Sequence, residues 1–143
     1  MLALAGVNSE STIYDLGCGD GGIVVAAARN HNAKKAVGIE QNHRLSSIAL
    51  RNTQHLKNAF IINANYDDVD ISEANVVTLY QSASENARLK RKLINELRVG
   101  SKVVSHDFGI PGWRPSEFCA FKEGHHGQRV MVYVLGLCTP LRY

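Results

Sequence analysis

Short apolar runs alternate along this chain with longer segments in which apolar residues recur at helical spacing. The runs predict five strands, at residues 12–16, 36–40, 59–63, 76–80 and 102–106. The segments between them predict three helices, at residues 21–30, 42–56 and 84–97. Strands and helices that alternate in this way are typical of a parallel sheet covered by helices on both faces.

The pattern changes after the fifth strand. A loop rich in glycine and proline precedes two further strands, predicted at residues 117–122 and 129–137 and joined by residues 123–127. We therefore predict an α/β fold: a Rossmann-like, doubly wound sheet of about seven strands, mostly parallel, with a C-terminal antiparallel hairpin. No internal repeat or linker interrupts the chain, so residues 1–143 are expected to form a single domain.

Residues 13–22, IYDLGCGDGG, combine a buried strand, an acidic residue near its end and a glycine turn that opens an alanine-rich helix. Glycines allow such a turn and let backbone N–H groups approach a ligand closely. The run therefore predicts a nucleotide-type cofactor. Gly17, Gly19 and Gly22 also fit the pattern G-x-G-x-x-G, which is equally typical of nicotinamide and flavin enzymes.

Asp15 separates these alternatives. A dinucleotide brings a diphosphate against the first glycine turn, where the carboxylate of Asp15 would repel it. S-adenosylmethionine (SAM) carries no phosphate, and its ammonium group is attracted to a carboxylate. Asp15 therefore favours SAM, with a nicotinamide-binding protein as the less favoured alternative.

Length and composition narrow the class further. A chain of 143 residues is too short for a cofactor domain and a separate substrate domain. No apolar run approaches the roughly 20 residues that span a bilayer, and no basic start suggests a signal peptide, so we expect a cytoplasmic protein without membrane contact.

The chain has three cysteines, Cys18, Cys119 and Cys138. Their odd number and the lack of C-x-x-C spacing favour reduced thiols. His106-Asp107 and His125-His126 offer no metal-ligand spacing, so we predict no metal site.

The formal net charge is only +3, but basic residues gather on one predicted helix and its exit. They are Arg88, Lys90, Arg91, Lys92, Arg98 and Lys102. A solvated helix face is the favoured interpretation, with a docking surface for an acidic partner or nucleic acid as the alternative. No aromatic residues alternate with these cations, so we predict no stable nucleic-acid partner.

Several segments resemble the class I SAM-dependent methyltransferases. Residues 15–21 (DLGCGDG) are similar to the first motif of that family and residues 37–40 (VGIE) to its second. Residues 69–78 (VDISEANVVT), 90–97 (KRKLINEL) and 103–113 (VVSHDFGIPGW) more closely resemble the small archaeal protein-lysine methyltransferases of broad specificity. The mitochondrial lysine methyltransferases are similar in turn. The resemblance covers nearly the whole chain and implies methyl transfer from SAM to lysine ε-amines of proteins.

The resemblance also implies where SAM binds. The methionine end is expected near Asp15 and the glycine turn, the ribose at Glu40, and the adenine near Asn65 and Tyr66. Gly17, Cys18, Gly19 and Gln41 complete the expected cofactor-binding residues. The family usually has aspartate at the position of Asn65, whose amide still accepts a hydrogen bond from the adenine amine.

The methyl-transfer site is predicted at Tyr80 and Gln81, because they follow the fourth strand at the carboxyl edge where ligands bind in open α/β sheets. Tyr80 is a candidate to orient the amine, with simple packing as the alternative. The expected partner is a protein with accessible lysines, and we expect a monomer or weak dimer.

One departure from the family concerns the start of the chain. Relatives usually begin with an additional segment that contains a Thr-Pro element, whereas residues 1–5 resemble their first helix. This short start predicts weak SAM binding. It also keeps a SAM-binding module with little activity as an alternative. An RNA or small-molecule methyltransferase is a second alternative to a protein-lysine methyltransferase, because loops determine the choice of substrate.

Overall fold

The computed structural model describes residues 1–123 and 126–137. Its strands are β1 (Thr12–Leu16), β2 (Lys35–Ile39), β3 (Ala59–Ile62), β4 (Val76–Leu79), β5 (Lys102–His106), β6 (Glu117–Glu123) and β7 (His126–Val134). Its helices are α1 (Leu2–Ala5), α2 (Gly22–Arg29), α3 (His43–Thr53), α4 (Ala83–Glu96) and the 3₁₀ helix η1 (Tyr66–Asp68). The bounds of the first five strands lie within one residue of those that the sequence predicts.

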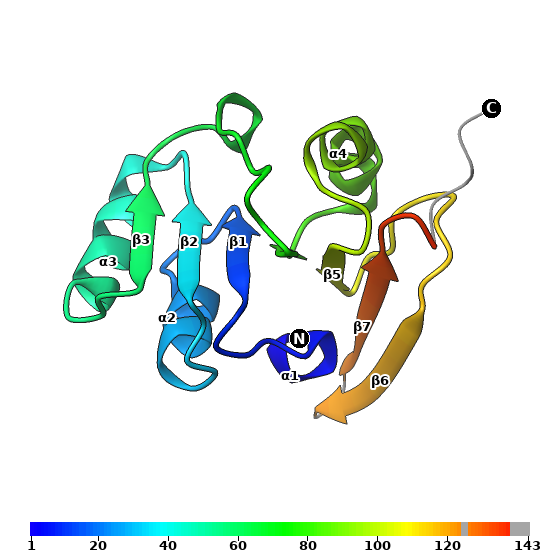
Figure 1. Cartoon of the computed structure of the whole chain (residues 1–143), viewed down its shortest axis with the longest axis horizontal. Helices are drawn as coiled ribbons and strands as arrows, with labels where there is room; N and C mark the ends of the chain where they lie inside the picture. Colours follow the sequence, from blue (N-terminus) through cyan, green and yellow to red (C-terminus); the bar gives the residue numbers. More distant parts are fainter. Residues whose placement is uncertain (124–125, 138–143) are drawn as a thin grey trace.

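All seven strands belong to one sheet, in the order β3-β2-β1-β4-β5-β7-β6 (Figure 1). The first five strands pair in parallel, whereas β7 is antiparallel to both β5 and β6. This arrangement confirms the predicted Rossmann-like sheet with a closing antiparallel hairpin. In place of a helix between β3 and β4, the chain forms the single turn of η1.

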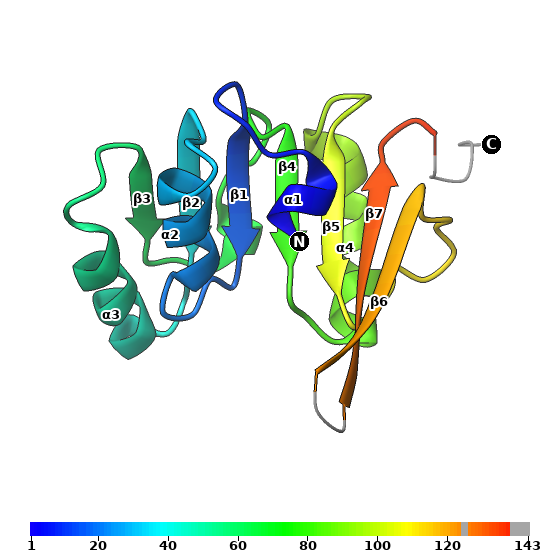
Figure 2. The ribbon, with the colours of Figure 1, turned by 90° about the horizontal axis from the view of Figure 1, so that it is seen from below.

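Helices cover both faces of the sheet (Figures 1 and 2). On one face α1, α2 and α3 bury Ala5, Ala27 and Ala49 against side chains of the sheet such as Ile13 and Val132. On the opposite face three leucines are buried against side chains of the sheet such as Tyr14, Leu16 and Val77. Leu89 and Leu93 belong to α4, and Leu97 follows its last residue. Neighbouring residues of β1 thus point to opposite faces, as the alternation of a strand requires.

Side chains fix where two of the helices begin. Asn42 accepts a hydrogen bond from the Leu45 backbone N–H (3.1 Å) and caps α3. Ser82 accepts one from the Glu85 N–H (3.2 Å) and caps α4. Such caps satisfy N–H groups that have no partner inside the helix. The Ser82 cap matters for the site, because it lies two residues after Tyr80.

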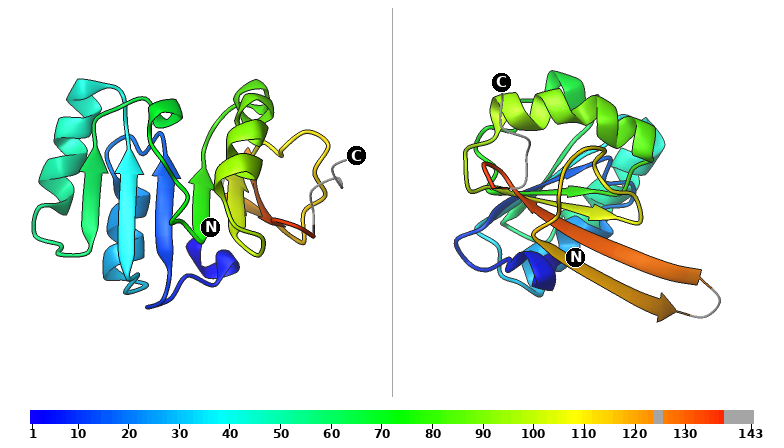
Figure 3. Two further views of the ribbon diagram at one scale, coloured as in Figure 1. Left: turned by 45° about the horizontal axis from the view of Figure 1, so that its top comes forward. Right: turned by 90° about the vertical axis from the view of Figure 1, so that its right-hand side faces the viewer.

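The C-terminal hairpin differs from its prediction in position. The seventh strand spans His126–Val134, three residues earlier at each end than the predicted 129–137. Gly136, with φ of +92°, lies in the turn that follows the strand, a conformation that a continuing strand does not adopt. His126 therefore belongs to β7, whereas His125 lies outside the described residues. Figure 3 shows the hairpin as an arm that extends beyond the body of the sheet.

The loop between β5 and β6 packs against the core at this end of the sheet. Its Ile110 and Trp113 are buried, and the Trp113 ring packs edge-on against Tyr133 of β7 with 5.9 Å between ring centroids. Trp113 is thus a core residue, the default interpretation of a lone tryptophan. Within residues 1–123 and 126–137, no helix has the length and apolar character needed to cross a membrane.

Candidate active site

The order in which the chain adds strands to the sheet reverses between β1 and β4. It proceeds from β1 outward to β2 and β3, then returns to place β4 on the other side of β1. In open α/β sheets a crevice forms at such a point, beyond the carboxyl ends of the strands. Gly17 follows β1 and Tyr80 follows β4, so the glycine turn and the predicted methyl-transfer residues meet there.

A cavity of about 340 Å³ opens at this crevice. Its lining combines the end of β1, the glycine turn, the start of α2 and one side chain from beyond β4: Asp15, Gly17, Cys18, Gly19, Asp20, Gly22, Ile23 and Tyr80. Five of these eight residues are ones that the sequence assigns to the site. The cavity is the candidate cofactor site.

Backbone contacts hold the glycine turn in place. The N–H groups of Gly17 and Cys18 both donate to the Ile39 carbonyl at the end of β2 (2.8 and 3.0 Å). Gly17 and Gly19 have φ of +78° and +56°, in the left-handed region that favours glycine. A Cβ on Gly17 would lie 2.4 Å from Gln81 Nε2, whereas a Cβ on Gly19 would meet no atom within 4 Å. Gly19 therefore faces open space beside the cavity.

Glu40 joins the end of β2 to this turn. Its carboxylate accepts hydrogen bonds from the N–H groups of Gly19 (2.9 Å) and Asn42 (3.0 Å), one at each oxygen. A carboxylate oxygen has more than one lone pair, so each retains capacity to accept a further hydrogen bond. Glu40 is thus both a support of the turn and an available acceptor.

Asp15 lies under the turn and is only 3% exposed. Its Oδ1 accepts a hydrogen bond from Thr78 Oγ1 of the neighbouring strand β4 (2.7 Å). Burial raises the pKa of Asp15 to about 6, against the lowering effect of the Thr78 hydrogen bond and with a further rise from the charge of Glu40. A cation that enters the cavity would relieve this cost of burying a charge.

Cys18 is a packing residue and carries no activated thiol. Its Sγ approaches the backbone of Gly38 so closely that a Cβ there would lie 2.6 Å away. Burial, followed by the charges of Asp15 and Glu40, raises the pKa of the Cys18 thiol to about 12. The thiol therefore stays protonated at neutral pH, and the small side chain fits where β2 passes the glycine turn.

The remaining predicted cofactor residues lie farther along the same edge of the sheet, outside the lining of this cavity. Gln41 is exposed directly after Glu40. Asn65 caps η1 by accepting from the Asp67 N–H (3.0 Å), and Tyr66 donates its hydroxyl to Glu85 of α4. Tyr66 thereby ties η1 to α4.

Tyr80 also lines a second cavity, of about 240 Å³. Residues that follow β4 and residues that end β5 line it: Tyr80, Gln81, Ser82, His106, Asp107 and Phe108. The Gln81 side chain donates from Nε2 to the Leu16 carbonyl (2.8 Å), which fixes it between β1 and β4. Tyr80 is 63% exposed and lines both cavities, so it forms their shared wall.

Asn86 supports the site, a role that the sequence analysis did not predict. It is fully buried, and its Nδ2 donates to Ser105 Oγ (3.2 Å) and to the carbonyls of Phe108 (2.9 Å) and Gly109 (3.3 Å). These bonds hold the start of the loop after β5 against α4. A signal was present: Asn86 stands three and seven residues before Leu89 and Leu93, on the apolar face of the predicted helix.

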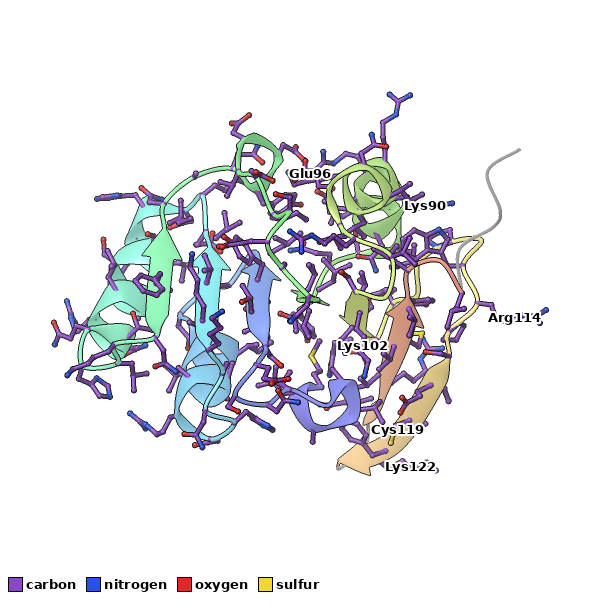
Figure 4. The ribbon with its side chains drawn as sticks, viewed as in Figure 1. Lys90, Glu96, Lys102, Arg114, Cys119 and Lys122 are labelled. Atoms are coloured by element: carbon purple, nitrogen blue, oxygen red, sulfur yellow. The ribbon has the colours of Figure 1, made fainter. Side chains whose placement is uncertain are left out.

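The basic residues near α4 are largely engaged with the protein itself. Arg88 pairs with Asp67 and Glu85, and Lys92 with Glu96. Lys90 and Lys102 donate to the carbonyls of Pro111 and Ala5, at 2.7 and 2.9 Å (Figure 4). These contacts favour the interpretation of a solvated helix face. Among the residues that the structure describes, no group of three His, Cys, Asp or Glu side chains is placed to hold a metal ion.

The sheet order, the glycine turn at the crevice and the closing antiparallel strand together define a Rossmann-like methyltransferase fold. The model of the ANTKMT methyltransferase domain family matches residues 15–117. The chain belongs to this family, which confirms the resemblance that its motifs indicate.

This chain is also similar to proteins of more than one described class. A protein-lysine N-methyltransferase of Saccharolobus islandicus (strain REY15A) is 45% identical over 141 residues, 95% of this chain and 86% of that protein. The adenine nucleotide translocase lysine N-methyltransferase of Mus musculus is 33% identical over 106 residues, 72% of this chain and 46% of that protein. The crystal structure of an RNA methyltransferase from Salinibacter ruber in complex with S-adenosyl-L-homocysteine is 35% identical, with a TM-score of 0.88, and covers 99% of this chain and 91% of its own.

Proposed function

We propose that this chain transfers methyl groups from SAM to lysine ε-amines of proteins. The observation that carries the proposal is the 45% identity, over 95% of the chain, to the protein-lysine N-methyltransferase of Saccharolobus islandicus. The two cavities that meet at Tyr80 support it, because methyl transfer needs a cofactor and an acceptor on opposite sides of one reacting carbon.

SAM is assigned to the cavity at the glycine turn. Its ammonium group would neutralise the buried Asp15, and the open space beside Gly19 leaves room for the methionine end. The ribose hydroxyls would donate to the free lone pairs of Glu40, as acidic residues at this position do for ribose in related folds. Gln41, Asn65 and Tyr66 stay predicted neighbours of the adenosine end.

The acceptor lysine is assigned to the cavity lined by Tyr80 and Gln81. The sulfonium of SAM is a good leaving group, so the protein has to align nitrogen, methyl and sulfur and to favour the neutral amine. Tyr80, at the shared wall, is placed to orient the amine by its hydroxyl or its ring. The Gln81 side chain, which lines the same cavity, is held by its hydrogen bond to the Leu16 carbonyl.

The raised pKa of Asp15 predicts that SAM binding weakens in mild acid. The ammonium attracts the ionised carboxylate, and protonation below about pH 6 removes that attraction. Calorimetry should therefore show about tenfold weaker binding at about pH 5 than at about pH 7, because only about a tenth of Asp15 stays ionised at the lower value. Asp15→Asn should bind weakly at both values. A parent affinity that does not change over this range would contradict the assignment of Asp15.

An RNA methyltransferase is the second candidate, favoured by the similarity to the Salinibacter ruber protein. The test is to incubate the chain with SAM labelled in its methyl group and, separately, with the protein, RNA and small-molecule fractions of a cell lysate. We expect label in the protein fraction. Label confined to RNA would support the second candidate, and label in no fraction would favour a SAM-binding module. A cytoplasmic location and a monomeric or weakly dimeric state stay predictions.

A further inference from the structure

The C-terminal hairpin reaches past the edge of the sheet where the cavity assigned to the lysine, the acceptor cavity, lies. The pairing of β5 with β7 ends at His106 and Val130. Residues 127–129 of β7 and their partners 120–122 of β6 therefore extend beyond the carboxyl end of β5, and we call them the hairpin arm. Figure 2 shows the hairpin projecting past the ends of β4 and β5.

Contacts through two residues join the hairpin arm to the acceptor cavity. The Asp107 N–H donates to the Arg129 carbonyl (2.7 Å), and Asp107 Oδ1 accepts from the Arg129 N–H (3.1 Å). The Gln128 amide oxygen accepts from His106 Nε2 (3.4 Å). Because Asp107 and His106 both line the acceptor cavity, a chain bound along the arm would lead directly into it.

One edge of β7 is open on the arm, because β5 turns away from it at Asp107. The φ of Asp107 is +62°, in the left-handed region, and the Phe108 N–H donates back to the His106 carbonyl (2.8 Å) in a tight turn. In an antiparallel strand, alternate residues direct their N–H and C=O groups to the same side. Those of Arg129 point to Asp107, so those of Gly127 point to the side that β5 has left. Gly127 thus offers a donor and an acceptor to an extended peptide, as in binding by strand addition.

A cavity of about 440 Å³ opens on the arm itself. The six residues of the arm line it: Ala120, Phe121, Lys122, Gly127, Gln128 and Arg129. A Cβ added to Gly127 would meet no atom within 4 Å, so the missing side chain leaves space beside the open edge. Glycine inside a strand often marks a place where a ligand or another backbone approaches closely. The cavity can therefore receive a side chain of a peptide that pairs with this edge.

Charge indicates which side chain that would be. Lys122 and Arg129 are exposed and line the cavity on the arm, where they favour a carboxylate. In the acceptor cavity, the carboxylate of Asp107 favours the ammonium of the acceptor lysine. The rise of a strand places Gly127 about 7 Å beyond Arg129, the partner of Asp107. In an extended peptide, this separation corresponds to an acidic residue about two positions from the acceptor lysine.

We propose that the hairpin arm binds the substrate segment that flanks the acceptor lysine, as an added strand with an acidic residue about two positions from that lysine. The inference rests on the proposed function, because it names the kind of lysine that the acceptor cavity receives. The backbone of the segment pairs with Gly127, and its carboxylate contacts Lys122 and Arg129. RNA carries negative charge as well, but it has no peptide backbone to pair with the open edge.

The test uses synthetic peptides that contain one lysine, with glutamate, glutamine or arginine two positions away on each side. The readout is methyl label from SAM on the lysine. With the parent, we expect the KM of the glutamate peptide to be about fivefold lower than that of the glutamine peptide, the size expected of two exposed ion pairs. The arginine peptide should have the highest KM. The three values of kcat should agree within about twofold, because the arm contributes to binding and not to the chemical step.

Reversing the charge of the arm should reverse the order of the peptides. Lys122→Glu combined with Arg129→Glu should bind the arginine peptide best, with the SAM affinity of the parent. Lys34→Glu combined with Lys57→Glu is the matched control, because these exposed lysines precede β2 and β3 at the opposite ends of the strands. The control makes the same change of charge and should keep the order of the parent.

Gly127→Val tests the cavity on the arm. The added side chain would fill this space without meeting the protein, so the chain should fold and bind SAM as the parent does. We expect the KM of the glutamate peptide to rise at least about fivefold, because valine occupies the place of the peptide. An unchanged KM would overturn the inference.

Equal KM values for the three peptides, or an order that charge reversal on the arm leaves unchanged, would also overturn the inference while the parent still labels lysine. A parent that labels lysate protein but none of the peptides would overturn it too, because an isolated segment should bind the arm. A parent that labels no protein lysine, or only RNA, would instead overturn the proposed function, and with it the inference.

Discussion

Gly19→Val is expected to abolish SAM binding while the chain still folds. Gly19 lies in the turn between β1 and α2, and a Cβ there would project into open space beside the candidate cofactor cavity. The valine side chain would occupy part of the volume assigned to the methionine end. Because no protein atom lies within 4 Å of that Cβ, the cost to folding is confined to the left-handed backbone, about 1–2 kcal/mol. Calorimetry should show affinity at least about 100-fold weaker, a loss of about 2.7 kcal/mol or more.

Gly100→Val is a matched control for this prediction. Gly100 also has a positive φ, +92°, and a Cβ there would likewise meet no atom within 4 Å. It precedes β5 at the opposite edge of the sheet from the cavity. The two variants should therefore lose similar stability, yet only Gly19→Val should lose the cofactor. Equal SAM affinity in both variants would show that the cofactor binds elsewhere.

Asn86→Ala is expected to lower the free energy of unfolding by about 2–4 kcal/mol. The fully buried amide donates to three acceptors, at Ser105, Phe108 and Gly109. Without it, two carbonyl groups and a hydroxyl lose a buried partner, and each such group costs about 1–3 kcal/mol unless it finds another. The Ser105 hydroxyl still donates to the Phe108 carbonyl and offsets part of the loss. Chemical denaturation measures the change.

Asn52→Ala provides the comparison on the surface of a helix. Asn52 is exposed on α3, and its amide makes a hydrogen bond to the Asp20 carbonyl (2.9 Å). Water can replace that bond, so the loss should stay below about 1 kcal/mol. If both variants lose the same stability, the network around Asn86 does not hold the loop as described. Asn86→Ala should also slow methyl transfer, because the loop carries Asp107 and Phe108 into the acceptor cavity.

Much of the fold is predictable because its strands are short apolar runs separated by helices with one apolar face. Residues 12–16 and 102–106 are strands in the structure with the predicted bounds. The bounds of β7 are harder, because Gly127 pairs with Lys122 inside the hairpin although glycine there suggests a turn. Helix α3 likewise ends at Thr53, three residues before the predicted end.

The residues of the site also differ in how far the sequence predicts that they lie together. Asp15, Gly17 and Gly19 share one local motif, so their neighbourhood is evident from adjacent residues. Contacts between distant segments are not: Tyr80 meets His106 only because β4 and β5 are neighbours, and Asp107 is fixed by Arg129 of the hairpin. The hydrogen bond from Tyr66, predicted near the adenine, to Glu85 of α4 is likewise a contact between distant segments. Such pairings depend on the packed fold, and no pattern along the chain encodes them.

The central claim, transfer of a methyl group from SAM to protein lysine, is tested most directly by the chemical identity of the labelled residue. The protein fraction of a lysate is incubated with the chain and SAM labelled in its methyl group, then hydrolysed to amino acids and separated by chromatography. The account predicts that the label elutes with methylated lysines and is absent when Gly19→Val replaces the parent. Label on another amino acid, or label in RNA with none in protein, would contradict it.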